Sequence, residues 1–106
     1  MEAISARDAA ELLRDEPEET ILLDVREHAE LAIAAIPGAL HIPMGEIAAR
    51  LTELDPNKII ICVCHMGGRS AQVTQFLNSR GCSRAVNLNG GITAWSQDVD
   101  PGIPFY

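Results

Sequence analysis

The sequence predicts an α/β fold, in which a central and mainly parallel β-sheet carries helices on both faces. Two short runs, "TILLDV" and "KIIICVC", are apolar without alternation, as expected for strands covered on both sides. Between such runs lie segments whose apolar residues recur at helical spacing. Strands that alternate with helices through 106 residues indicate an α/β domain. We expect a single domain covering residues 1–106.

The N-terminal half is predicted to begin with a capped helix. Ser5 can cap a helix that runs to about Arg14, because its hydroxyl can accept a backbone N–H of the first turn. A polar break around Pro17 separates this helix from the strand "TILLDV". The elements that follow are a short helix "HAELAIAA", a turn at Pro37-Gly38, a brief strand "LHIP" and a helix over residues 46–54.

The C-terminal half continues the alternation of strands and helices. After "KIIICVC", Val73, Phe76 and Leu77 mark one face of a helix over residues 69–80, and Gly81 suits the position just beyond its end. "AVNL" predicts a further strand, and "GGITAWSQ" predicts a turn into a last helix with Trp95 in the core. Sites in parallel sheets form at the carboxyl ends of strands, where "LLDVRE" and "CVCHMGGRS" both lie.

Composition and charge narrow the possible functions. Acidic residues outnumber basic ones by 15 to 8, giving a net charge of −7, so we do not expect a nucleic-acid partner. No run approaches the roughly 20 apolar residues of a membrane span, and the N-terminus "MEAISARDAA" lacks the features of a secretory signal. The sequence therefore predicts a cytoplasmic protein without a membrane partner. Three cysteines do not form a disulfide framework, which leaves the question of whether one is reactive.

Cys64 ends a predicted strand, and Arg69 or Ser70 begins the next helix. The intervening "HMGG" is short, and Gly67 and Gly68 permit backbone angles that other residues resist. Backbone N–H groups can therefore converge on one point, together with those of the helix N-terminus. A thiol there should ionise below its free pKa of about 8.5, and Arg69 adds a permanent positive charge. We interpret Cys64 as a reactive thiolate that needs no metal.

Each cysteine also has a purely structural interpretation. A free cysteine often acts as a small core hydrophobe, and we assign that role to Cys62, within an apolar strand, and to Cys82. A zinc site from Cys62, Cys64, His65 and Cys82 is disfavoured, because no paired C-x-x-C spacing is present. A reactive Cys64 requires that the loop amides face its sulfur and that packed side chains do not seal the sulfur from donors.

Four separated segments resemble one known family. "CHMGGRS" resembles the active-site loop of the rhodanese family of sulfurtransferases, and "LLDVREHAE", "IPGALHIP" and "NLNGGITAW" resemble its other recurring segments in the same order. The resemblance runs from about Ile4 to the end and is closest to small single-domain bacterial rhodaneses. It also extends to rhodanese domains fused to enzymes that activate sulfur-carrier proteins. It implies a three-layer domain with a central parallel sheet of about five strands, and neither a bound cofactor nor a metal.

The resemblance implies a double displacement through Cys64. The thiolate takes the outer sulfur of a donor such as thiosulfate or a persulfide, and an acceptor then removes it. The acceptor would be cyanide, a thiol or a sulfur-accepting protein. The substrate-binding loop implied by the match consists of His65, Met66, Gly67, Gly68, Arg69 and Ser70. Asp24 and Arg26 are implied as supports, with Arg26 pairing with Asp24 or Glu30. An ordinary ion pair at a strand end is an equally open interpretation of these residues.

The length of the loop and two differences from the usual sequence of the family refine this hypothesis. Four residues separate Cys64 from Arg69, one fewer than in related phosphatases and arsenate reductases, so the ring suits a single sulfur better than a phosphoryl group. Residues 34–36, "AAI", stand where the family usually has Gly-His-Ile. Arg69 is the only permanent cation of the loop, which leaves open whether thiosulfate is the donor. His41 is interpreted as structural rather than as part of the pocket.

Three functional hypotheses remain at this stage. The first is a sulfurtransferase enzyme that works through a Cys64 persulfide. The second is a relay that hands sulfur to another protein, for which the acidic surface would favour a basic partner. The third is a non-catalytic binding or regulatory module, which the intact Cys64, Arg69 and loop glycines disfavour.

Overall fold

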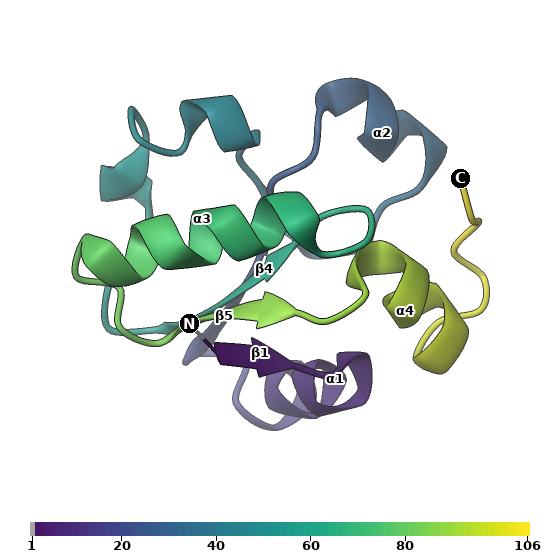
Figure 1. The fold of residues 1–106 in the computed structure, drawn as a ribbon. Coiled ribbons are helices and arrows are strands. Elements are labelled where there is room, and N and C mark those ends of the chain that lie inside the picture. Colours follow the sequence, from purple (N-terminus) through teal and green to yellow (C-terminus); the bar gives the residue numbers. More distant parts are fainter. Residues whose placement is uncertain (1) are drawn as a thin grey trace.

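The computed structural model describes residues 2–106 and shows a five-stranded sheet flanked by four α-helices (Figure 1). The strands are β1 (Glu2–Ile4), β2 (Thr20–Asp24), β3 (Leu40–His41), β4 (Ile59–Val63) and β5 (Ala85–Leu88). The helices are α1 (Ala6–Asp15), α2 (His28–Ile33), α3 (Gly68–Ser79) and α4 (Gly91–Asp98). None of the helices within residues 2–106 combines the length and the apolar character that crossing a membrane requires.

The sheet is parallel throughout, in the order β1-β5-β4-β2-β3. In Figure 1, α3 crosses one side of the sheet, and α1 and α4 lie on the other. Alternate residues of β4 point to opposite sides. Ile60 and Cys62 join a buried cluster that includes Val73 and Leu77 of α3. Ile61 and Val63 join a second cluster with residues of α1 and α4, including the buried Trp95. The predicted α/β fold with a parallel sheet covered on both faces is therefore confirmed.

Local signals in the sequence account for most of the element boundaries. The hydroxyl of Ser5 accepts a hydrogen bond from the backbone N–H of Asp8 at 3.1 Å, as expected of an N-cap. Gly81 has a φ of +94°, the left-handed conformation that commonly follows a helix end, directly after the C-cap Arg80 of α3. The predicted strands at "TILLDV", "LHIP", "KIIICVC" and "AVNL" correspond to β2, β3, β4 and β5.

Two local predictions need correction. The strand β1 was not predicted, because it has only three residues, is largely exposed and pairs only with β5 along the edge of the sheet. The helix expected over residues 46–54 is wrong. This segment forms two 3₁₀ helices, η1 (Met44–Glu46) and η2 (Leu51–Glu53), joined by a turn. Arg50, with φ −113° and ψ 18°, lies outside the α-helical region and interrupts the run.

The register between β2 and β4 positions the candidate site. The two strands pair along their whole length, so that Asp24 lies opposite Val63. Beyond the last pair, the backbone N–H of Val25 donates to the carbonyl of Val63 at 3.0 Å. The segments that follow the two strands, "VRE" and "CHMGG", therefore leave the sheet side by side, at the carboxyl edge where sites form in this class of fold.

Candidate active site

Cys64 follows β4 directly, and the loop after it turns back around its sulfur. The backbone N–H of Gly67 donates to the Cys64 Sγ at 3.1 Å. The backbone N–H groups of Arg69 and Ser70, in the first turn of α3, also lower the pKa of Cys64. Gly67 has a φ of +115°, which a residue with a side chain rarely adopts, and this turn allows the amides to face inward. The arrangement is an anion cradle made of main-chain N–H groups.

A buried hydroxyl completes the cradle. The Ser70 Oγ lies 3.2 Å from the Cys64 Sγ and 2.5 Å from the Oδ1 of Asn87 on β5. Asn87 is held in this orientation, because its Nδ2 donates to the Gly67 carbonyl at 3.2 Å. A serine hydroxyl has one proton, so Ser70 can donate either to Asn87 or to the sulfur. Ionisation of Cys64 favours donation to the sulfur, since hydrogen bonds to charged acceptors are stronger.

The start of α4 fixes the direction of the peptide groups around Cys64. The backbone N–H of Ile92 donates to the carbonyl of Cys64 at 2.9 Å, and that of Thr93 donates to the carbonyl of His65 at 3.3 Å. Gly91 makes this approach possible. A β carbon on Gly91 would collide with both of these carbonyl oxygens, and its φ of +59° is itself in the left-handed region. The segment "NGG" is therefore part of the site, although it lies far from Cys64 in sequence.

The three cysteines differ in acidity. Burial raises the pKa of Cys64, but the hydrogen bonds from the Ser70 hydroxyl and from the backbone N–H groups of Ser70, Gly67 and Arg69 outweigh it, so that the pKa lies below its ordinary value. Burial raises the pKa of Cys62 to about 12, and it also raises that of Cys82. Both Cys62 and Cys82 lie in the core, as the sequence predicted.

Access to the sulfur differs from the expectation. Only 1% of the surface of Cys64 is exposed to solvent, so little of this residue faces the surface in this conformation. The low exposure of Cys64 differs from the openly accessible thiol that was expected from the sequence. The requirement that the loop amides face the sulfur is met, because the backbone N–H of Gly67 donates to it. The loop itself reaches the surface, since Met66 is 67% exposed.

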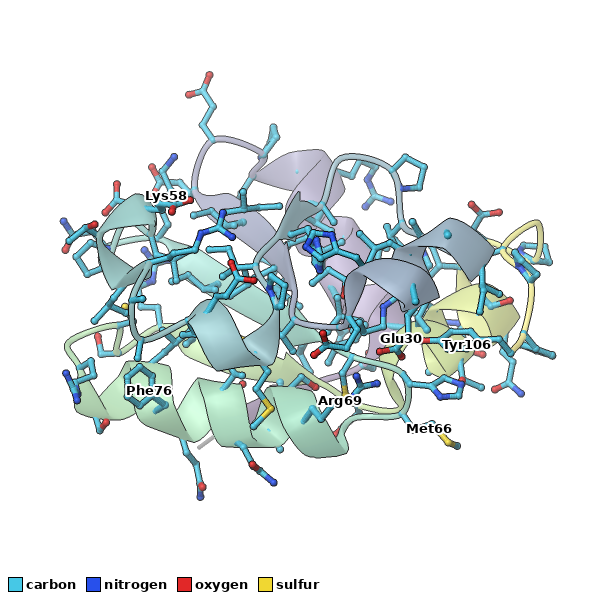
Figure 2. All side chains as sticks on the ribbon, turned by 90° about the horizontal axis from the view of Figure 1, so that it is seen from above. Glu30, Lys58, Met66, Arg69, Phe76 and Tyr106 are labelled. Atoms are coloured by element: carbon cyan, nitrogen blue, oxygen red, sulfur yellow. The ribbon has the colours of Figure 1, made fainter. Side chains whose placement is uncertain are left out.

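Arg69 does not project freely into a binding site. Its guanidinium makes two hydrogen bonds to Glu30 of α2, from Nη1 to Oε1 at 2.6 Å and from Nη2 to Oε2 at 2.8 Å. The hydroxyl of Tyr106 donates to the same carboxylate at 2.7 Å, and its ring stacks on His65 with 3.9 Å between ring centroids. Figure 2 shows Glu30, Arg69 and Tyr106 side by side, with Met66 pointing outward next to them. We call Glu30, Arg69, Tyr106 and His65 the mouth cluster.

Asp24 and Arg26 form a buried ion pair beneath this cluster. The Arg26 Nη2 lies 2.7 Å from the Asp24 Oδ2, and the side chains are 0% and 2% exposed. Arg26 also donates from Nη2 to the Ala34 carbonyl at 2.7 Å and from Nη1 to the Tyr106 hydroxyl at 2.9 Å. Of the two partners considered for Arg26, the structure selects Asp24. Arg26 thus connects the ends of β2 and α2 with the C-terminal segment.

The structure also shows where His41 and the residues of the disfavoured zinc site lie. The His41 Nε2 lies 2.6 Å from the Arg26 carbonyl, which agrees with the structural interpretation of this residue. Within residues 2–106, no group of three or more His, Cys, Asp or Glu side chains is arranged to hold a metal ion. The described residues therefore give no support to a zinc site at Cys62, Cys64, His65 and Cys82.

Comparison with known proteins agrees with this architecture. A model of the rhodanese-like domain matches residues 5–98 of the chain. The chain belongs to the rhodanese-like family. A putative sulfurtransferase of Bacillus subtilis, YtwF, is 40% identical over 84 residues, which cover 79% of this rhodanese-like chain and 81% of the relative. A sulfurtransferase of Allochromatium vinosum is 38% identical over 87 residues, or 82% of this chain and 78% of the relative.

Some relatives are considerably longer. A chloroplastic protein of Arabidopsis thaliana, named as containing rhodanese-like and PpiC domains, is 43% identical over 93 residues, and the match spans only 31% of its length. Among solved structures, a rhodanese-like domain protein from Staphylococcus aureus is 35% identical, with a TM-score of 0.84 over all of this chain and 99% of the other.

Three residues of the rhodanese-like site were not predicted as site residues. Glu30 was considered only as a partner of Arg26, and Asn87 only within the strand "AVNL" and the segment "NLNGGITAW". Tyr106 was considered only within the stretch, up to the last residue, that the resemblance covers. The sequence could have indicated a role for Asn87, because an amide within the apolar strand "AVNL" needs a polar partner when it is buried. Tyr106 carries no comparable signal, since its contacts with Arg26 and Glu30 join residues about 80 positions apart.

Replacing Gly91 with Ala should displace the loop from α4. We expect the free energy of unfolding to fall by about 2 kcal/mol or more, because the new β carbon meets two backbone carbonyls at a positive φ. Urea denaturation measures this change. Gly68→Ala is the matched control, since a β carbon added there would meet nothing within 4 Å and its φ is not positive, and it should change stability by less than about 1 kcal/mol. Equal effects of the two substitutions would contradict the account.

Replacing Ser70 with Ala should raise the pKa of Cys64. In wild-type protein, the rate of Cys64 alkylation by iodoacetamide should reach its midpoint below the free-thiol value of about pH 8.5. Loss of the Ser70 hydroxyl should raise that midpoint by about one pH unit, since it removes a hydrogen bond to the charged form. Ser79→Ala, at an exposed position of the same helix, should leave it unchanged. A wild-type midpoint at or above 8.5 would refute the lowered pKa.

Proposed function

We propose that this chain is a sulfurtransferase that carries a transferred sulfur atom as a persulfide on Cys64. The single observation that supports this most strongly is the set of donors directed at the Cys64 Sγ, the Ser70 hydroxyl together with the backbone N–H groups of Gly67, Arg69 and Ser70. These donors lower the pKa of Cys64 although it is buried. They are the groups that would hold an anionic sulfur without a metal.

The proposed reaction has two displacements. The Cys64 thiolate attacks the outer sulfur of the donor, a new S–S bond forms, and the bond between that sulfur and the rest of the donor breaks. With thiosulfate the leaving group is sulfite, and with a persulfide it is a thiolate. An acceptor thiolate then attacks the outer sulfur of the Cys64 persulfide, takes it away as a new persulfide and returns Cys64 to the thiolate.

Each residue of the loop has a proposed part in these steps. Cys64 is the nucleophile, and the amides of Gly67, Arg69 and Ser70 stabilise first the thiolate and then the persulfide anion. The remaining loop residues, His65, Met66 and Gly68, would form the outer rim that a donor meets. Asp24 and Arg26 would act indirectly, by bracing the segment that carries Glu30 and the mouth cluster.

The names of relatives support the same reaction class. YtwF of Bacillus subtilis is described as a putative sulfurtransferase, and the relative from Allochromatium vinosum as a sulfurtransferase. A further relative, YrkF, is described as a putative sulfur carrier protein. A reactive thiol with a lowered pKa is not what a purely binding module needs, so we favour transfer chemistry over the non-catalytic alternative.

Incubation with a sulfur donor should load Cys64. We expect the mass of the intact protein to rise by about 32 Da after treatment with thiosulfate or cysteine persulfide, and peptide mapping should place the added sulfur on Cys64. The adduct should disappear when dithiothreitol is added as the acceptor. Cys64→Ser should abolish loading, because the nucleophile is gone.

Cys82→Ala serves as the control for this experiment. Cys82 is buried and burial raises its pKa, so its loss should leave loading unchanged. The proposed function is refuted if neither donor loads the wild-type protein, or if Cys64→Ser is loaded as fast as wild type.

A further inference from the structure

The only permanent cation of the active-site loop is neutralised by a carboxylate. Arg69 and Glu30 form a bidentate pair at 2.6 and 2.8 Å, with side-chain exposures of 37% and 18%. The hydrogen bonds to Glu30 are the largest cause that raises the pKa of Arg69, and the negative charge of ionised Cys64 is among the further causes. A donor that approaches Cys64 therefore meets Arg69 together with the negative charge of Glu30.

Glu30 is held in place from three directions. Besides Arg69, the Tyr106 hydroxyl donates to its Oε2 at 2.7 Å, and the backbone N–H of Glu27 donates to its Oε1 at 3.1 Å within a capping box at the start of α2. The hydrogen bonds from Arg69, followed in importance by that from Tyr106, lower the pKa of Glu30 to about 2 in spite of its partial burial. The carboxylate is therefore charged throughout the neutral pH range.

Tyr106, which donates to Glu30, is itself held in place. Tyr106 accepts a hydrogen bond from the buried Arg26 at 2.9 Å, and its ring lies nearly parallel to that of His65, at an interplanar angle of 13°. Three segments meet at this point, namely α2, the active-site loop and the C-terminal segment (Figure 2). The Arg69–Glu30 pair is thus part of a fixed network, unlike an isolated surface ion pair, whose side chains are free to part.

We propose that Glu30 determines donor selectivity, by cancelling the charge of Arg69 and so disfavouring dianionic donors relative to persulfides, which carry at most one net negative charge. This inference rests on the proposed sulfurtransferase function and names the donor class of that site. Thiosulfate brings two negative charges next to the Glu30 carboxylate. Cysteine persulfide brings no net charge while its persulfide is protonated, and one negative charge once it ionises. In a partly buried site such charge differences are weakly screened and act on the rate of approach and attack.

The atoms and charges balance for both donors. With cysteine persulfide, the Cys64 thiolate takes the outer sulfur and its proton, and cysteine leaves as a thiolate. With thiosulfate, the Cys64 thiolate takes the outer sulfur and becomes a persulfide anion, which keeps the single negative charge of the thiolate. Sulfite leaves with the two negative charges that thiosulfate brought. Only in the second case do two negative charges enter and leave past Glu30, so its removal should affect the two donors differently.

Glu30→Gln tests this inference directly. Glutamine keeps an oxygen that can accept from Glu27 and Arg69, but it leaves the charge of Arg69 uncancelled. Rate constants for the loading of Cys64 are measured by rapid quenching and intact mass, with thiosulfate and with cysteine persulfide. We expect the rate constant for thiosulfate to rise about tenfold and that for cysteine persulfide to change less than about twofold.

Glu53→Gln is the matched control. Glu53 of η2 forms an ion pair with Arg50 at 2.8 Å. Its neighbours in the chain line a surface depression with Arg80, which follows the C-terminal end of α3, whereas Cys64 precedes the N-terminal end of that helix. Glu53→Gln should leave both rate constants unchanged. If Glu30→Gln is still loaded but the ratio of the two rate constants is unaltered, or both rate constants fall equally, the inference is overturned and the sulfurtransferase proposal stands. Failure of both donors to load any variant or the wild type would instead refute the sulfurtransferase proposal, and this inference with it.

Discussion

The orientation of the peptide groups around Cys64 is the constraint on which the rest of the site depends. A sulfur anion within a nearly buried residue is stable only if donors replace the water it has lost. Here the donors are main-chain N–H groups at the start of α3 and one serine hydroxyl. Their direction is set from the opposite side, because α4 binds the carbonyls of Cys64 and His65. The cradle therefore depends on two helix N-termini that hold one loop between them.

The sheet brings these parts together. The pairing of β2 with β4 places the Asp24–Arg26 pair next to the loop, and β5 carries Asn87 to the Ser70 hydroxyl. Arg26 also donates a hydrogen bond to Tyr106, and Tyr106 donates to Glu30, which binds Arg69. The buried ion pair and the mouth cluster thus form one polar network. Such networks favour one arrangement of their members, because a partly satisfied one is costly.

The sequence predicted the parts of this structure that depend on local patterns. Uniformly apolar runs gave β2 and β4, the serine cap gave the start of α1, and the cysteine followed by glycines indicated the cradle. The segment over residues 46–54 shows the limit of this approach, since one helix was expected there but Arg50 leaves helical geometry. The edge strand β1 has too few residues and too little burial to produce a pattern.

The least predictable features are contacts between distant side chains. Nothing in the sequence assigns Glu30 to Arg69 instead of Arg26, because the choice depends on where α2 and α3 lie in space. The same holds for Tyr106, whose partners belong to α2 and to the two loops that follow β2 and β4. The low exposure of Cys64 is likewise a property of the packed site, which the two glycines of the loop do not reveal.

The most direct test of the amide cradle is an NMR titration of the backbone amides. As Cys64 ionises, the amide protons of Gly67, Arg69 and Ser70 should shift together, with one midpoint below about pH 8.5, and these shifts should be absent in Cys64→Ser. Amide protons that do not respond to the ionisation of Cys64, or a common midpoint at or above pH 8.5, would contradict the account.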